Sequence, residues 1–173
     1  MKIKNLLVVV YALVLALVTV LYSCSSNDNS TSGGGIDKNT ISGTITFTDS
    51  VFLTDTAHGY YSVDAFATWP PTGNATASLK IKPTKQSDNT YKASYQFTGM
   101  ASGSYVITSS YIKLPYVVGT SVYGLGIYGC DTAHNSACIY NSAIQKATIT
   151  NDAGVANINF LSWGDTTRHI YRF

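Results

Sequence analysis

The residues best suited to hold a metal ion occur in two copies of one four-residue segment, Asp-Thr-Ala-His. The first copy spans residues 55–58 and the second spans residues 131–134. Two aspartates and two histidines can ligate a divalent cation if both segments meet at one end of a fold. A four-residue repeat arises readily in a chain of this composition, however, and no longer repeat surrounds either copy. The sequence therefore predicts no metal site and no cofactor, and a metal-dependent enzyme is the weakest of the alternatives.

Other catalytic arrangements find little support among the residues. All nine acidic residues are aspartate, so glycosidase chemistry with paired carboxylates would have to use Asp twice. No Gly-x-Ser-x-Gly segment accompanies the serines, histidines and aspartates that a hydrolytic triad needs. We predict that the protein is not an enzyme, and we assign no catalytic residue.

The aromatic residues, which include thirteen tyrosines and two tryptophans, indicate a different chemistry. Exposed aromatic rings stack on sugars, and Tyr60, Trp69 and Trp163 lie in or beside expected loops, so they are the candidate ligand-binding residues. The favoured interpretation is that most such rings close the core or cover the ends of sheets. A carbohydrate-binding surface module is kept as an alternative function.

Charge and composition narrow the class of protein further. The formal net charge is +2, and removal of an N-terminal segment containing Lys2 and Lys4 would bring it to zero. A nucleic-acid-binding protein needs a basic face, so this balance predicts no nucleic-acid partner. Charged residues make up only 12 % of the chain, and glutamate is absent. Helix surfaces are usually filled with Glu and Lys, so the composition favours strands over long helices.

The N-terminal segment predicts export from the cytoplasm. A start with two lysines, an apolar run over residues 6–22 and a small residue before the cleavage point describe an export signal. The alternative is an uncleaved membrane anchor, since the run approaches the length of a spanning helix.

Four residues at the end of this run, Leu21-Tyr22-Ser23-Cys24, resemble the lipobox of bacterial lipoproteins. The resemblance implies that residues 1–23 are a lipoprotein signal peptide and that Cys24 is acylated. Three acyl chains hold a protein firmly on a membrane. The implied location is the bacterial cell envelope, with a lipid anchor in the outer membrane, at its periplasmic face or at the cell surface. Residues 24–40, rich in Ser, Asn and Gly, are expected to form a flexible tether.

The remaining residues, 41–173, show the alternation of period two that indicates strands. Phe66 points away from the apolar face of its strand, which indicates cover on both faces of that strand. We also expect residues 147–149 and 156–160 to form a hairpin around Asn151–Gly154. Seven or eight short strands with frequent turns predict an all-β fold, an antiparallel β-sandwich. The other expected strands span residues 41–48, 61–68, 77–82, 91–97, 105–111 and 123–128.

The connection between the fourth and fifth expected strands is more specific. Gly99 and Gly103 permit a tight connection, Met100 is expected to plug the end of the core, and Tyr105 is expected to return its hydroxyl to nearby backbone. Residues 95–107 resemble the aromatic-x-Phe-x-Gly-Leu-x-x-Gly-x-Tyr joint of transthyretin-like (prealbumin-like) and carboxypeptidase regulatory-like domains. The resemblance covers residues 41–163 and implies a spacer, stalk or binding module, with no ligand-binding residue carried over.

Two cysteines, Cys130 and Cys138, remain after the acylated one. An exported chain meets oxidising conditions, so we predict that they form a disulfide that closes a short polar loop. The alternatives are a zinc site or a reactive thiol, but His134 is the one histidine nearby. Together these observations predict a cell-envelope lipoprotein that acts as a non-catalytic binding or structural module. Its expected partners are the membrane, through the lipid anchor, and a glycan or another envelope protein.

Overall fold

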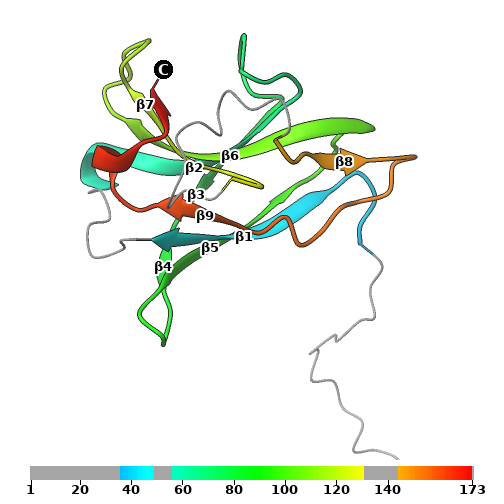
Figure 1. Ribbon diagram of the computed structural model, residues 1–173, viewed down its shortest axis with the longest axis horizontal. Coiled ribbons are helices and arrows are strands. Elements are labelled where there is room, and N and C mark those ends of the chain that lie inside the picture. Colours follow the sequence, from blue (N-terminus) through cyan, green and yellow to red (C-terminus); the bar gives the residue numbers. More distant parts are fainter. Residues whose placement is uncertain (1–35, 49–55, 131–143, 173) are drawn as a thin grey trace, which may run out of the picture. The chain divides into compact units, whose positions relative to one another are not determined.

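The structure is a computed structural model that describes residues 36–48, 56–130 and 144–172. Strands dominate these ranges, and the helical residues within them are confined to two short 3-10 helices, η2 (Thr56–His58) and η4 (Thr166–Arg168). The strands form two curled sheets that face each other (Figure 1). The predicted all-β sandwich is therefore confirmed. None of the helices in the described ranges is long and apolar enough to cross a membrane.

The first sheet has the strand order β4-β5-β1-β9, and the second sheet has the order β10-β7-β6-β2-β3. The additional strand β8 pairs with the beginning of β6. Among the described residues, eight strands have three residues or more and two have only two, in agreement with the seven or eight predicted. In chain order the strands are β1 (Ile41–Thr48), β2 (Gly59–Phe66), β3 (Ala77–Ile81), β4 (Thr84–Lys85), β5 (Tyr91–Phe97), β6 (Gly103–Lys113), β7 (Val122–Ile127), β8 (Ala147–Ile149), β9 (Phe160–Trp163) and β10 (Tyr171–Arg172).

Alternating side chains from both sheets form the main core, as the period of two predicted. Ile45 and Phe47 of β1 pack with Tyr61 and Val63 of β2, and all four are almost fully buried. The rings of Phe47 and Tyr61 meet edge to face, with centroids 5.2 Å apart. The Tyr61 hydroxyl also donates a hydrogen bond to the backbone carbonyl of Gly164, just after β9. The two sheets are thus joined by polar as well as apolar contacts.

The connection between β5 and β6 has the local geometry that its residues predicted. Gly99 has a φ of 68°, and Met100 is buried in the main core. The Tyr105 hydroxyl donates a hydrogen bond to the Ala101 carbonyl oxygen at 3.0 Å, which is the return contact of a tyrosine corner. These local features are confirmed, and the resemblance to a transthyretin-like family stays a prediction.

A second cluster of apolar side chains lies on the outer face of the second sheet. The β6–β7 register shifts between Ser109 and Ser110, which leaves Leu125 as the extra residue of a β-bulge. The bulge lets Leu125 enter the main core while Ile127, two residues later, faces outward. This second cluster consists of Val106, Ile127, Cys130 and Ile144, with Trp69 and Ile170 packed against it.

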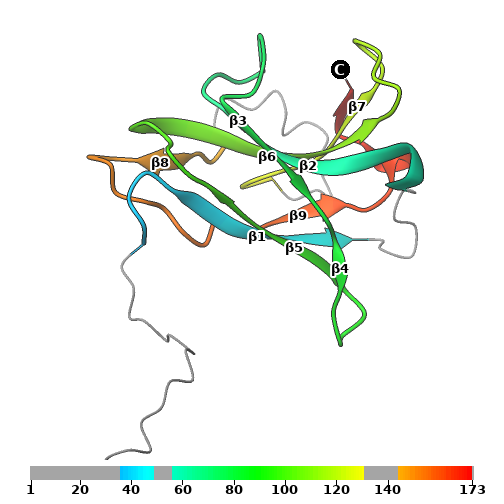
Figure 2. The ribbon, with the colours of Figure 1, turned by 180° about the vertical axis from the view of Figure 1, so that it is seen from behind.

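The hairpin predicted for residues 147–149 and 156–160 is wrong. Its turn does form, because Asn151 and Asp152 both have positive φ and the Ala153 N–H donates to the Thr150 carbonyl oxygen at 3.0 Å. The two arms leave the turn toward different sheets: β8 pairs with β6, whereas β9 runs parallel to β1 (Figure 2). The sandwich is thus antiparallel except for the β1–β9 pair and the nearby parallel bridge between Ile41 and Val155.

Candidate functional site

Asp64 forms the polar floor of a groove on the outer face of the second sheet. Strand alternation places it there, because its neighbours Val63 and Ala65 point into the main core. The Ser62 hydroxyl donates a hydrogen bond to Oδ2 of Asp64 at 3.0 Å, and the Ser78 hydroxyl donates to Oδ1 at 2.5 Å. The strand register explains this gathering, since Asp64 pairs with Ser78 of β3.

A third hydroxyl, that of Ser110 on β6, also forms a hydrogen bond with the Asp64 carboxylate. Asp64 itself is only 7 % exposed. Burial raises the pKa of Asp64, and the three serine hydroxyls offset part of this rise because they stabilise the charged form. The floor is therefore a carboxyl group held among hydroxyl groups in a region of low solvent access.

The walls of this groove, called the Asp64 groove below, are mainly apolar. They come from the connection between β2 and β3, which supplies Pro71 and Gly73, and from the connection between β6 and β7, which supplies Tyr116. The cavity has a volume of about 480 Å³, which is within the range of small-molecule sites. Its lining consists of Asp64, Phe66, Pro71, Gly73, Asn74, Ala75, Ser78, Ser110, Ile112, Tyr116 and Val122.

The β6–β7 connection is unusually apolar for an exposed loop. Tyr116, Val117 and Val118 are 56 %, 55 % and 82 % exposed. The loop is nevertheless held in place, because the Val117 N–H donates to the Ser121 hydroxyl oxygen at 2.7 Å. Both connections that wall the Asp64 groove project from the same side of the molecule in the two ribbon views (Figures 1 and 2). The loop thus presents an aromatic and aliphatic edge beside the carboxylate.

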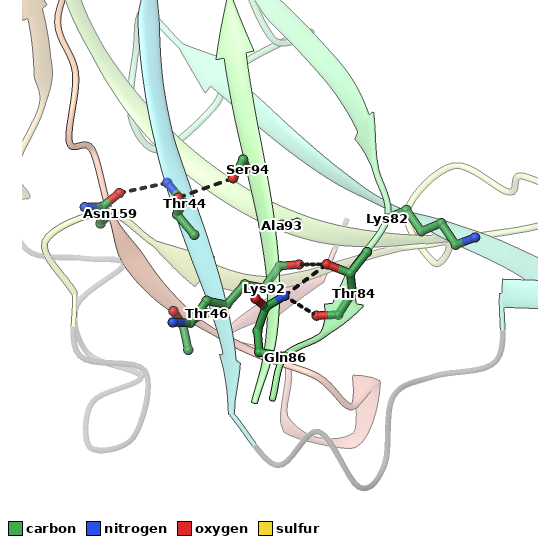
Figure 3. Close-up of a pocket in the computed structure, with 9 residues that line it drawn as sticks. All are labelled: Thr44, Thr46, Lys82, Thr84, Gln86, Lys92, Ala93, Ser94 and Asn159. Carbon is green, nitrogen blue, oxygen red and sulfur yellow. Dashed lines mark hydrogen bonds between the residues drawn. The ribbon is translucent and has the colours of Figure 1, made fainter. Parts of the chain in front are cut away.

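A second groove, the first-sheet groove, lies on the outer face of the first sheet (Figure 3). Its volume is about 680 Å³, and its side chains are mostly hydroxyls, amides and two lysines. Several of these groups already bind one another: the Thr44 N–H donates to Asn159 Oδ1 at 2.8 Å, and the Gln86 amide donates to the Thr84 carbonyl oxygen at 3.0 Å. The lining consists of Thr44, Thr46, Lys82, Thr84, Gln86, Lys92, Ala93, Ser94 and Asn159.

The three aromatic residues predicted to bind a ligand lie on separate parts of the sandwich. Tyr60 is the second residue of β2, Trp69 follows the other end of that strand, and Trp163 belongs to the first sheet. All three are half-buried and engaged within the protein. Lys80 Nζ lies 4.8 Å from the Tyr60 ring centroid, and the guanidinium of Arg168 lies 5.1 Å from that of Trp163.

Trp69 packs edge to face on Phe66, with ring centroids 5.9 Å apart, and it also contacts the second cluster. It therefore packs against a residue of the groove wall, since Phe66 lines that groove. The structure does not bring Tyr60, Trp69 and Trp163 together as one stacking platform.

Several residues predicted from the sequence lie outside the described ranges. These are the lipidation site Cys24, the disulfide partner Cys138, and Asp55 and residues 131–134 of the repeated segments. Cys130 is described and is buried in the second cluster, but the predicted disulfide with Cys138 stays a prediction. Within the described ranges, no group of three or more His, Cys, Asp or Glu side chains is placed to hold a metal ion.

Sequence reasoning missed the residues of the Asp64 groove. One signal was available: Asp64 is a charged residue in the middle of a strand predicted to be covered on both faces. That cover is confirmed, because Ser62 and Asp64 are buried on one face of β2 while Val63 and Ala65 are buried on the other. Comparison with known protein families, with curated proteins and with solved structures finds no match to this chain.

Proposed function

We propose that this protein is a lipoprotein of the bacterial cell envelope whose β-sandwich is a non-catalytic binding module. Acyl chains on Cys24 would anchor it in the outer membrane, and residues 24–40 would tether the sandwich to that anchor. The binding site of the module is the Asp64 groove.

The observation that carries the proposed binding role is the make-up of the Asp64 groove. A buried carboxylate with ordered hydroxyls forms the floor, and apolar side chains form the walls. Ligand sites in proteins commonly combine apolar walls with a few convergent polar groups that fix orientation. The residues that line this groove can bind a ligand through hydrogen bonds, through charge and through apolar contact.

A screen for binding tests this role directly. Gly73 lines the groove and has open space where a Cβ would lie, so Gly73→Trp should fill the groove without disturbing the fold. The matched control is Ser87→Trp, an exposed position in the turn before β5. Full-length protein in non-ionic detergent is screened by thermal shift against amines, sugars and organic acids. We expect compounds that raise the melting temperature of the wild type and of Ser87→Trp but leave Gly73→Trp unchanged. If none does, the binding role is rejected.

The anchor is tested by metabolic labelling with an alkyne-bearing fatty acid. We expect the label on the wild type and on the neighbouring control Ser25→Ala, and its complete loss in Cys24→Ser. A label that persists in Cys24→Ser contradicts the proposed anchor.

Carbohydrate binding is a second candidate, favoured by the first-sheet groove. Its hydroxyl, amide and lysine side chains (Figure 3) match the hydroxyl and carboxylate groups of acidic polysaccharides. A glycan array with the full chain tests this candidate. Binding should weaken at least tenfold in Lys82→Ala, which removes a lining lysine, and should survive in Lys85→Ala, which removes an exposed lysine outside the groove. A silent array contradicts carbohydrate binding.

A further inference from the structure

The charge of the Asp64 groove is one-sided. Asp64 is the one charged side chain among the described residues that line it. The pKa of this carboxyl is set by burial and by three serine hydroxyls, and no neighbouring cation contributes to it. A buried carboxylate is costly unless a positive charge pairs with it. None of the described residues that line the groove therefore supplies a positive charge to pair with Asp64.

The charged groups on the neighbouring strands do not supply this partner. Lys80 of β3 lies on the same outer face, opposite Ser62, but its ammonium lies over the Tyr60 ring at 4.8 Å from the centroid. Lys113 ends β6 in an exposed position. On the β6–β7 connection, the side chain that faces the groove is the phenol of Tyr116. A positive charge at the floor has to come from outside this set of residues.

The hydroxyls at the floor are already oriented. Ser78 and Ser110 give their protons to Asp64, so what each hydroxyl can offer a ligand is its oxygen, as a hydrogen-bond acceptor. Together with the carboxylate they offer three acceptors close together. An ammonium group carries three N–H donors, and a guanidinium carries five. A neutral polyol would leave the charge of the carboxylate unpaired.

The walls favour the same kind of ligand. Phe66 and Tyr116 place aromatic rings beside the floor, and Ile112 and Val122 add aliphatic surface. Cations are attracted to the faces of aromatic rings, most strongly where water is excluded. The hydrocarbon part of a ligand gains from burial against the aliphatic side chains.

We propose that the Asp64 groove binds a small organic cation, with its ammonium or guanidinium group on Asp64, Ser78 and Ser110 and its hydrocarbon body against Phe66, Ile112 and Tyr116. This inference rests on the proposed binding role and names the chemical class of the ligand. A volume of about 480 Å³ suits a molecule of the size of an arylalkylamine or a short diamine.

Isothermal titration of the full chain in non-ionic detergent tests the inference. The probes are 2-phenylethylamine, tyramine, cadaverine and agmatine, each compared with the alcohol of the same length. At least one cation should bind at pH 7.5 at least tenfold more tightly than its alcohol. Affinity should also fall as the pH is lowered, because protonation of Asp64 removes its charge while the amine stays charged.

Two aspartate variants sharpen the test. Asp64→Asn keeps the shape of the floor but removes the charge, and it should weaken cation binding at least tenfold. Asp88→Asn removes an exposed aspartate from the turn before β5 and should leave binding unchanged. The comparison of amine with alcohol and the pH series use the wild type, so the test holds even if Asp64→Asn fails to fold.

The outcomes separate this inference from the role on which it rests. If sugars or organic acids bind in a manner that Gly73→Trp abolishes, while the four cations do not bind, the binding role stands and the cation inference is overturned. Equal affinity for amines and alcohols overturns it as well. If no compound of any class binds in a manner sensitive to Gly73→Trp, both proposals fail.

Discussion

Asp64 places a carboxyl group where little water reaches it, and this burial should make the stability of the fold depend on pH. Because burial raises the pKa of Asp64 above 3.8, the ordinary value for aspartate, the folded chain keeps a proton that the unfolded chain has lost. The contribution of this group to the free energy of unfolding therefore falls as the pH rises from 3.8 through the raised pKa. Above that window the cost of burying the charge is fully present.

We predict that Asp64→Asn unfolds at a higher urea concentration than the wild type at pH 7. The advantage should disappear near pH 3, where Asp64 is protonated in both the folded and the unfolded states. Urea titrations at both pH values measure it, with Asp88→Asn as the control for an exposed aspartate. A variant less stable than the wild type at pH 7 would mean that the three serine bonds outweigh the cost of burial. Loss of ligand binding together with a gain in stability is typical of a functional site.

Thr108 is the residue beside Asp64 across the β2–β6 pair, and it lies between the Asp64 groove and the second cluster. It is fully buried, and its hydroxyl has no hydrogen-bond partner among the described residues. A buried hydroxyl without a partner is unfavourable, so Thr108→Val should raise the free energy of unfolding by about 1 kcal/mol. The matched control is Thr40→Val, because the buried Thr40 hydroxyl donates to the Asp37 carbonyl oxygen at 2.6 Å and its loss should destabilise the fold. Equal effects of the two changes in chemical denaturation would contradict the assignment.

At the scale of elements, a glycine in β1 allows residues 155–158 to pack closely along that strand. The segment after the Asn151 turn lies along β1, with the Ser42 N–H donating to the Val155 carbonyl oxygen at 2.9 Å and the Ile158 N–H donating to the Ser42 carbonyl oxygen at 3.1 Å. A Cβ on Gly43 would overlap the carbonyl oxygen of Ile158. The segment can approach β1 so closely because position 43 has no side chain.

Gly43→Ala should therefore lower the free energy of unfolding by about 2 kcal/mol, since overpacking against backbone forces the two segments apart. Gly73→Ala is the matched control, because its Cβ meets open space and the change should be close to neutral. Urea denaturation of both variants makes the comparison. A Gly43→Ala variant as stable as the wild type would show that residues 155–159 are free to move away from β1.

The regular strands were predictable because each of them turns alternate side chains into the main core, which imposes a period of two on the residues. β1 and β5 begin and end at the residues expected, and β2, β3, β6 and β7 lie within about two residues of their predicted limits. Two-residue strands such as β4 and β10 are too short to leave such a pattern. The hairpin predicted for residues 147–160 was wrong for a different reason. Its turn residues indicate a reversal of the chain, but they carry no information on which strands the two arms will pair with.

The Asp64 groove was out of reach for the same reason. Its hydroxyls come from three strands, with Ser62 on β2, Ser78 on β3 and Ser110 on β6. They meet because of the order and register of the second sheet, and alternation along one strand determines neither. The one indication in the sequence was Asp64, a charged residue inside a strand that was expected to be covered on both faces.

For the molecule as a whole, the outer face of the second sheet has two regions that share one strand. Along β6, Val106 belongs to the second cluster, whereas Ser110 and Ile112 line the Asp64 groove. Trp69 connects the two regions, because it packs on the second cluster and on Phe66 of the groove wall. Through Trp69, the groove wall is in packing contact with a cluster that also contains Cys130.

A disulfide between Cys130 and Cys138 would stabilise that cluster. We predict that its reduction lowers the stability of the whole fold. Closing so short a loop should contribute about 2–3 kcal/mol to the free energy of unfolding. Full-length protein unfolded without reductant should show no thiol that reacts with maleimide, because Cys24 is acylated, and should show two after reduction. The double variant Cys130→Ala/Cys138→Ala should match the reduced protein in stability and bind ligands in the Asp64 groove more weakly. Two reactive thiols in the unfolded, unreduced protein would contradict the pairing and leave the second cluster to support the groove by packing alone.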